Sequence, residues 1–370
     1  MQTDFSEEQE RFREVVARFL QDKSPAAEVR RLMETEQGFS DDVWAELTSE
    51  LGLAGTHLPE EYGGFGYGPV ELGIVLEEMG RRLYCGPFFA SSVMAAYALL
   101  LAGSDSAKQT LLRDIASGSV IATLVLDSLN APKLIGTGVS QSAGYLSGRA
   151  RLVVDAQNAD QLLVIANKKP GFGLYSLSKG SDGVSVTPAE AMDPTRKLAS
   201  VSFDHAAAVE VGSFDYRLLN DIWDHICVAL AHEMVGGAQY LFETTIEYTK
   251  LRYQFGRPIG SFQGLKHRCA DMLMELEFAK AATHHAAFCL ATADDQAAEP
   301  YAASMAKALA ADAYLKIAKE AIQMRGGIGF TWEEDTHLWF KRAKSSEVFM
   351  GTPAIHRERM MVYMEEEEAA

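Results

Sequence analysis

Cysteine is scarce in this sequence, and apolar runs are short. Four cysteines occur in 370 residues, at positions 85, 227, 269 and 289, and no two of them form a Cys-x-x-Cys pair. Isolated cysteines argue against a zinc cage and against a disulfide scaffold, and they favour a reducing compartment. No apolar segment approaches the roughly 20 residues of a membrane-spanning helix. The acidic N-terminus has no signal-peptide pattern. These absences predict a cytoplasmic protein without membrane insertion.

Positive charge is also in deficit. The chain has 34 Lys and Arg residues against 51 Asp and Glu residues, which gives a net charge of −17. Such a surface repels phosphate backbones, and the sequence contains no local basic cluster, so nucleic-acid binding is not expected. The composition is otherwise that of a folded globular protein, with 48% hydrophobic residues, and the length predicts two or three domains.

The spacing of apolar residues changes twice along the chain and predicts three domains. Residues 1–117 repeat apolar side chains at helical spacing, beginning with a capping box formed by Ser6 and Gln9. Residues 118–213 alternate short apolar runs with turn residues, which predicts a small antiparallel β-barrel or sandwich. Residues 214–370 return to helical spacing. The predicted fold class is therefore α+β, in the order helices, strands, helices.

The C-terminal region contains three long helical patterns, at residues 222–250, 262–292 and 299–325. Pro300 stands near the start of the third, where the first turn of a helix accepts proline. Helices of this length usually pack against each other as near-antiparallel neighbours. The sequence therefore predicts a helical bundle in this region.

Three short stretches are more specific than the periodicity: RYQFGRPI at residues 252–259, QMRGGIGF at 323–330, and LPEEYGG at 58–64. Taken singly, each has a plain structural interpretation. Glycines after a long helix commonly end it, and an arginine at a helix end complements the helix dipole.

Together and in this order, the three stretches resemble the acyl-CoA dehydrogenase family. The likeness extends over nearly the whole chain and is most specific in the C-terminal bundle. It implies an α-helical N-terminal domain, a β middle domain and a C-terminal four-helix bundle, with FAD held between subunits. The implied reaction is α,β-desaturation of an acyl-CoA thioester. In that reaction a glutamate removes the α-proton, flavin N5 accepts the β-hydride, and an electron-transfer flavoprotein takes the electrons.

The resemblance also implies a set of FAD-binding residues that reach across the subunit interface to the neighbour's FAD. Arginine suits pyrophosphate because its guanidinium forks onto phosphate oxygens. Glycine lets backbone N–H groups approach an anion, and glutamine amides suit adenosine or ribitol groups. The matched positions are Arg252, Gln254, Phe255, Gln263, Gln323, Gly326 and Gly327.

The catalytic base of the family is missing from both of its usual positions. In the family's C-terminal motif an acidic residue precedes a Gly-Thr pair, whereas here Met350 precedes Gly351 and Thr352. A thioether cannot accept the α-proton. Other relatives place the glutamate near the start of the first C-terminal helix, a position that matches Ile226. The resemblance therefore implies no catalytic residue in this chain.

The middle domain departs from the family pattern as well. The Thr-Glu-Pro-Gly stretch that shelters the flavin and acyl chain matches residues 126–132, where the pattern is lost. The Trp-Ile-Thr segment that faces the flavin ring matches Leu152, Val153 and Val154. The losses thus fall on residues that would surround the chain's own flavin, while those lent to a neighbour remain.

This one-sided loss indicates a subunit that completes the FAD site of a related, base-bearing subunit. It resembles the base-lacking subunit of the heterotetrameric acyl-CoA dehydrogenases of bacterial steroid side-chain breakdown. Two alternatives stay open at this point. Glu347 or Glu233 could serve as a relocated base in a self-sufficient homomeric enzyme, or the chain could be a non-enzymatic acyl-CoA-binding or scaffold protein. The sequence does not choose between a fatty acyl chain and a steroid side chain.

Histidines in the predicted bundle helices, among them His232, His284 and His285, have no third ligand at metal spacing in the sequence. Hydrogen-bonded core or surface histidines are the expected interpretation, and no metal is predicted.

Overall fold

The computed structural model describes residues 5–126, 138–292 and 301–369, and its contacts divide the chain into two compact units. The helical unit comprises Met1–Ala27, Gly73–Tyr84 and Cys227–Ala370, and the sheet unit comprises Glu28–Leu72 and Cys85–Ile226. The predicted division into residues 1–117, 118–213 and 214–370 stays a prediction. Within the described residues, every helix falls short of the length and apolarity required to traverse a bilayer.

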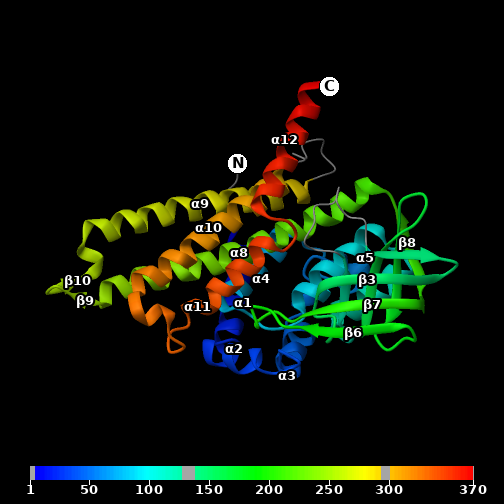
Figure 1. The fold of residues 1–370 in the computed structure, drawn as a ribbon, viewed down its shortest axis with the longest axis horizontal. Helices are drawn as coiled ribbons and strands as arrows, with labels where there is room; N and C mark the ends of the chain where they lie inside the picture. Colours follow the sequence, from blue (N-terminus) through cyan, green and yellow to red (C-terminus); the bar gives the residue numbers. More distant parts are fainter. Residues whose placement is uncertain (1–4, 127–137, 293–300, 370) are drawn as a thin grey trace. The chain divides into compact units, whose positions relative to one another are not determined.

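Long helices dominate the helical unit, and α9 and α10 run side by side in it (Figure 1). The three helices predicted from residue 222 onward are confirmed as α8, α9 and α10, but the predicted start of the third, at residues 299 and 300, lies outside the described residues. The capping box at Ser6 and Gln9 is also confirmed, with both of its hydrogen bonds present. The elements that lie in this unit wholly or in part are α1 (Glu7–Lys23), α4 (Pro69–Arg82), α8 (Tyr216–Leu251), β9 (Tyr253–Gln254), β10 (Arg257–Pro258), η7 (Ile259–Ser261), α9 (Gln263–Ala291), α10 (Ala302–Arg325), η8 (Gly326–Phe330), α11 (Thr336–Val348) and α12 (Pro353–Ala369).

Glycines allow α4 and α8 to approach each other at backbone distance. A Cβ added to Gly80 would stand 2.0 Å from the carbonyl oxygen of Glu233, and one added to Gly236 would stand 1.9 Å from that of Glu77. Neither distance is compatible with a side chain. This close approach brings polar residues of α4 and α8 into direct contact.

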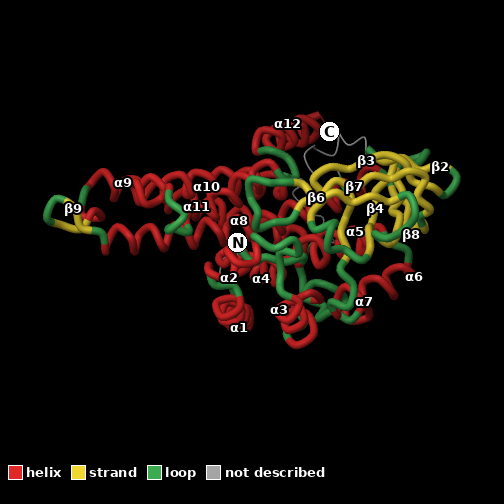
Figure 2. Tube along the Cα trace, turned by 60° about the horizontal axis from the view of Figure 1, so that its bottom comes forward, coloured by secondary structure: helices red, strands yellow, loops and turns green. Residues whose placement is uncertain are grey.

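The sheet unit combines the remaining helices with eight strands, coloured yellow in Figure 2. Its helices, wholly or in part, are α2 (Ala26–Met33), α3 (Asp41–Ala45), η1 (Glu46–Glu50), η2 (Leu53–Gly55), η3 (Glu60–Tyr62), η4 (Phe89–Ala95), α5 (Ala96–Ala102), α6 (Asp105–Ala107), η5 (Lys108–Leu112) and α7 (Arg113–Ser117). The strands are β1 (Ala122–Val125), β2 (Val139–Ser142), β3 (Tyr145–Val154), β4 (Gln161–Asn167), β5 (Phe172–Ser178), β6 (Val184–Ala189), β7 (Leu198–Ala207) and β8 (Val209–Phe214).

The strands form one sheet in the order β6-β7-β3-β2-β4-β5-β8, with β1 added beside β4. Most neighbours are antiparallel, as the sequence predicts, but β1 and β2 each pair with β4 in parallel. One face of the sheet buries a core that includes Leu146, Leu162, Val164 and Val201. The predicted α+β order of helices, strands and helices is confirmed.

Candidate functional site

Arg252 and the residues after it form a hairpin that joins α8 to α9. Tyr253 and Gln254 of β9 pair antiparallel with Pro258 and Arg257 of β10. Phe255 and Gly256 make the turn with left-handed φ angles of 54° and 76°. The Phe255 side chain is 90% exposed. Arg252 and Gln254 are exposed too, as is Gln263 in the first turn of α9. Leu251 and Tyr253 nearby are 76% and 63% exposed, and exposed apolar side chains that gather in this way are typical of a surface that contacts another molecule.

The second predicted group lies where α10 ends. Gln323 is exposed, and Gly326 turns the chain with a φ of 65°. A Cβ added to Gly326 or Gly327 would meet no heavy atom within 4 Å. The backbone at these two glycines is therefore open to a bound anion, as the FAD interpretation requires.

Tyr248 brings the two groups to the same end of the helical unit. Its hydroxyl donates to the carbonyl oxygen of Arg325 at 3.4 Å, and its own carbonyl accepts the N–H of Arg252 at 2.9 Å. Arg252 is thus bonded to Tyr248 directly, and Gly326 directly follows Arg325, which is bonded to Tyr248 as well. The sequence missed the contribution of Arg325, whose buried guanidinium donates to the hydroxyl of Thr245 at 2.9 Å and to Glu334 at 3.0 Å. These bonds fix the end of α10.

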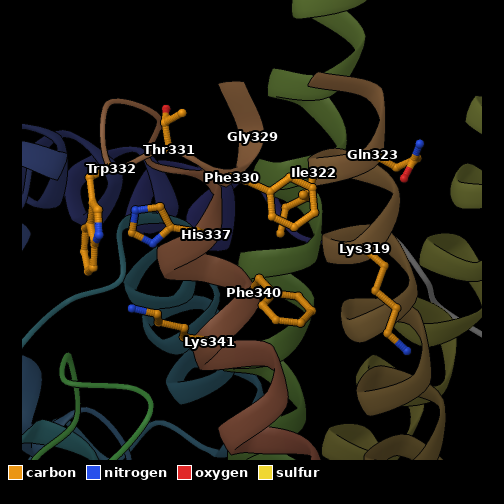
Figure 3. A pocket seen from close by; sticks show the side chains of 10 residues that line it. All are labelled: Lys319, Ile322, Gln323, Gly329, Phe330, Thr331, Trp332, His337, Phe340 and Lys341. Atoms are coloured by element: carbon orange, nitrogen blue, oxygen red, sulfur yellow. The ribbon is translucent and has the colours of Figure 1, made fainter. Parts of the chain in front are cut away.

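A pocket of about 390 Å³ adjoins the end of α10 (Figure 3). It combines aromatic rings with ammonium groups: the Nζ of Lys341 lies 4.6 Å from the ring centroid of Trp332, which meets His337 edge-on at 4.7 Å. The pocket is open on one side, where Trp332 and Phe330 are exposed. Its lining residues are Lys319, Ile322, Gln323, Gly329, Phe330, Thr331, Trp332, His337, Phe340 and Lys341.

Met350, at the expected base position, is fully buried in the helical unit, with 0% of its surface exposed. Its φ of 58° is left-handed, and its carbonyl oxygen accepts a hydrogen bond from Nε2 of His356 at 2.9 Å. The Cys227 thiol points at the same carbonyl from 3.9 Å. Burial, followed by the nearby Lys307 charge, lowers the pKa of His356 to about 3, so the ring is neutral when it donates. The thioether occupies space in the core and faces no solvent.

Lys307 of α10 also holds this loop from inside the core. Its ammonium donates to the carbonyl oxygen of Gly351 at 3.1 Å and to that of Glu347 at 3.3 Å. Its exposure is 0%, and burial lowers its pKa to about 8. The sequence gives little sign of this role, because a single lysine in an alanine-rich helix usually extends its charged end to solvent.

Lys307 predicts an unusual dependence of stability on pH. The unfolded chain holds this proton up to a pKa near 10.5, whereas the folded chain releases it near 8. Between these values the unfolded state binds more protons, so stability rises with pH. Between pH 7.5 and 10.5 we expect the free energy of unfolding of the wild-type protein to rise by about 3 kcal/mol relative to that of Lys307→Met. Below pH 7 the difference between the two proteins should not change with pH. Urea unfolding at each pH measures this difference. A difference that stays flat across the window would mean that Lys307 is not buried as a cation.

The other carboxylates considered as relocated bases each have a cationic partner. Glu233 is buried, and its carboxylate accepts from the guanidinium of Arg342 at 2.9 Å, with both side chains less than 10% exposed. Glu347 pairs with Lys344 on the same face of α11. Ile226, the alternative base position, lies in α8 with 0% exposure. The structure thus surrounds both predicted base positions with core packing.

The segment that matches the flavin-facing part of the middle domain lies at the end of β3. Val153 and Val154 are 2% and 1% exposed, and Leu152 adopts a left-handed φ of 55° where the pairing with β7 shifts register. Each of these side chains is apolar, so none donates a hydrogen bond to a flavin. Residues 127–132, the rest of the altered region, lie outside the described residues.

Comparison with known proteins gives concordant results. The protein-family model described as acyl-CoA dehydrogenase, N-terminal domain, matches residues 6–119 of the sequence. The family model for the acyl-CoA dehydrogenase C-terminal domain matches residues 224–364. A curated relative, acyl-CoA dehydrogenase IpdE2 of Mycobacterium tuberculosis, is 33% identical over 355 residues, covering 94% of each chain.

Two solved structures share the fold over the full chain. A variant of the Tcur3481-Tcur3483 steroid ACAD superposes with a TM-score of 0.89 at 27% identity, covering 98% of this chain and 99% of that one. The ChsE4-ChsE5 complex from Mycobacterium tuberculosis contains a chain with a TM-score of 0.88 at 24% identity, with 99% of each chain covered. The two domain models and the IpdE2 relative establish that this chain belongs to the acyl-CoA dehydrogenase family, whose members are FAD-dependent oxidoreductases that act on CH–CH bonds.

Proposed function

We propose that this chain is a subunit that supports α,β-desaturation of an acyl-CoA thioester by completing the FAD site of a related, base-bearing subunit. The observation that supports this most strongly is a contrast within the helical unit. The residues matched to a neighbour's FAD are exposed, with Phe255 at 90%, whereas Met350 at the base position is at 0%. A self-sufficient enzyme would also need an accessible acidic residue at the base position, where Met350 stands.

The described residues in the hairpin between α8 and α9 and at the end of α10 fit the FAD that the family uses. Bound FAD supplies the acceptor for the substrate hydride. Arg252 would fork onto its pyrophosphate, and the open backbone at Gly326 and Gly327 would approach the same anion. The neighbouring pocket offers Trp332 for stacking and Lys341 for phosphate oxygens. Gln254, Gln263 and Gln323 would contribute amide hydrogen bonds.

Helix α9 supports the requirement for a partner subunit. Four of its large apolar side chains are 44–60% exposed: Leu273, Met274, Phe278 and Phe288. Exposed apolar side chains that recur along one helix are typical of a protein–protein interface. The structures reported for the ChsE4-ChsE5 complex and the Tcur3481-Tcur3483 enzyme each combine two named chains. A pair of unlike but related subunits therefore suits this chain better than a homomer.

The proposal extends to the reaction partners and to the compartment. An electron-transfer flavoprotein would reoxidise the flavin, as the family resemblance implies. The substrate is an acyl-CoA, and the steroid enzyme among the solved relatives favours a steroid side chain over a simple fatty acid. All four cysteines are free thiols, which suits the reducing cytoplasm.

Flavin content tests this proposal directly. The chain purified alone is expected to hold little FAD and to give no desaturation of acyl-CoA thioesters with an artificial electron acceptor. Coexpression with a related subunit that carries the base should yield a yellow complex that is active. Robust turnover by the flavin-loaded chain alone would contradict the proposal and favour a relocated base. A colourless but stable complex would favour the scaffold alternative.

Arg252→Ala is expected to release FAD from the complex while both subunits stay folded. Loss of a charge-assisted phosphate contact costs about 1.5–3 kcal/mol, which corresponds to a fall in FAD affinity of roughly 10- to 150-fold. Flavin fluorescence after gel filtration measures this. The matched control is Lys250→Ala, an exposed cation in the last turn of α8 that pairs with Glu247. Equal FAD retention in both variants would show that Arg252 only terminates the helix.

A further inference from the structure

Two histidines and a glutamate meet inside the helical unit, far from the residues matched to FAD. Glu77 of α4, His232 of α8 and His284 of α9 are brought together from three helices. Nδ1 of His232 lies 2.9 Å from Oε1 of Glu77, and Nε2 of His284 lies 2.8 Å from the same oxygen. The sequence shows no third ligand near these histidines, because Glu77 is 155 residues away from His232 in the chain. The close approach of α4 and α8 at their glycines brings the Glu77 carboxylate to His232 in the folded chain.

The chemistry of these three atoms matches a site for a divalent transition metal. Two imidazole nitrogens and one carboxylate oxygen form a ligand set found at zinc sites, and all three atoms lie within 4.8 Å of one another. Tetrahedral ligands around zinc stand roughly 3.3 Å apart. The two contacts with Oε1 would therefore have to open by only about 0.5 Å to admit the ion. That movement is within the reach of side-chain rotation.

The second oxygen of Glu77 is already held in the manner of a metal ligand. Oε2 accepts from the guanidinium of Arg13 at 2.8 Å, which fixes the carboxylate and leaves Oε1 facing the two imidazoles. Ligating carboxylates are commonly oriented by such an outer hydrogen bond. The aromatic ring of Phe5 meets His284 edge-on at 5.0 Å, and Arg13 covers Phe5 at 4.7 Å. Phe5 and Arg13 thus cover part of the cluster.

The charges around the cluster leave room for a cation. Arg13 and Arg81 face three carboxylates, those of Glu77, Glu78 and Glu243. Burial is the main cause that lowers the pKa of His232. Burial opposes ionisation of Glu77, but hydrogen bonds from both histidines outweigh it and hold the pKa of this carboxyl well below its usual range. At their usual charges, these two guanidinium groups and three carboxylates sum to one negative charge.

We propose that Glu77, His232 and His284 bind one divalent transition-metal ion of the zinc class, which fastens α4, α8 and α9 together. His284 is the most accessible of the three, with 21% of its side chain exposed, so a solvent molecule reaches the fourth coordination position from its side. The role is structural, since the cluster uses none of the residues matched to the flavin. The site does not depend on the proposed function of the subunit.

Zinc titration of the full chain tests this proposal, with adjacent histidines as a matched pair. The protein is first treated with a chelator and then titrated with Zn²⁺ by calorimetry at pH 7.5. Wild type and His285→Ala are expected to bind one equivalent, and His284→Ala to bind at least about tenfold more weakly. His285 lies next in sequence, and its Nε2 lies 3.5 Å from the sulfur of Cys289. Zn²⁺ should also raise the melting temperature of the first two proteins and leave that of His284→Ala unchanged.

Failure of wild type to bind Zn²⁺, or equal binding by His284→Ala, would overturn the proposal and leave a hydrogen-bonded cluster alone. Loss of binding in His285→Ala would overturn it too, because it would place the ion near Cys289. If His284→Ala does not fold, Co²⁺ titration of wild type decides the question. A visible absorption band that saturates at one equivalent supports the site, and its absence contradicts it. Neither measurement depends on flavin or activity, so the outcome is independent of the subunit's role.

Discussion

Met350→Glu is expected to add no dehydrogenase activity and to lower the free energy of unfolding by about 2–5 kcal/mol. The methionine is at 0% exposure, so the new carboxyl would be buried in apolar surroundings. Burial should raise its pKa above the unperturbed value of about 4.3. The buried donors Lys307 and His356 already bind carbonyl oxygens of the same loop.

Two measurements check this result. Urea unfolding gives the stability change, with Met350→Leu as the control, since this swap of similar volume should cost less than about 1.5 kcal/mol. Single-turnover bleaching of the flavin by a panel of acyl-CoA thioesters gives the activity, in a complex whose partner has lost its own base. Bleaching in the Met350→Glu complex would show that this chain does face a flavin, and the proposed division of labour would be wrong.

Local patterns in the sequence were sufficient for most of the fold. The helical period identified α8, α9 and α10, and the capping box at Ser6 is present in the structure as predicted. Alternating apolar runs identified the strands, because strand formation depends on neighbours in the chain and on burial of one face. The parallel pairing of β1 and β2 with β4 was not predictable, since register between distant strands depends on contacts that no local pattern records.

The residues of the candidate site also differ in how far the sequence alone reveals them. Arg252, Gly326 and the residues near them lie in short continuous motifs, which the sequence displays directly. The side chains that hold the loop at Met350 do not form a continuous motif. Cys227, Lys307 and His356 come from three helices and meet only after folding. The Glu77 cluster is more extreme, since His284 is 207 residues away from Glu77 in the chain. Contacts at such separations are set by helix packing, which single residues in the sequence do not reveal.

Arg342→Met is expected to destabilise the helical unit by about 3–5 kcal/mol. Arg342 of α11 and Glu233 of α8 form an ion pair at 2.9 Å, with 4% and 7% of their side chains exposed. Removal of the guanidinium takes away the cation that pairs with the buried Glu233 carboxylate, and breaking a buried ion pair on one side is costly. The double variant Glu233→Met, Arg342→Met removes both charges, so it should recover most of the loss. Urea unfolding of the wild type, the two single variants and the double variant completes the cycle.

Variants of Glu233 also distinguish its proposed structural role from the alternative in which it is a relocated catalytic base. A structural Glu233 predicts that Glu233→Gln changes stability but leaves flavin reduction by acyl-CoA in the complex unchanged, because the partner supplies the base. A catalytic Glu233 predicts the opposite: flavin bleaching would persist when the partner's base is removed and would vanish in Glu233→Gln. A carboxylate that accepts a hydrogen bond from a buried arginine is poorly placed to move toward a substrate, since movement outward breaks the ion pair with Arg342. We therefore expect bleaching to depend on the partner's base alone.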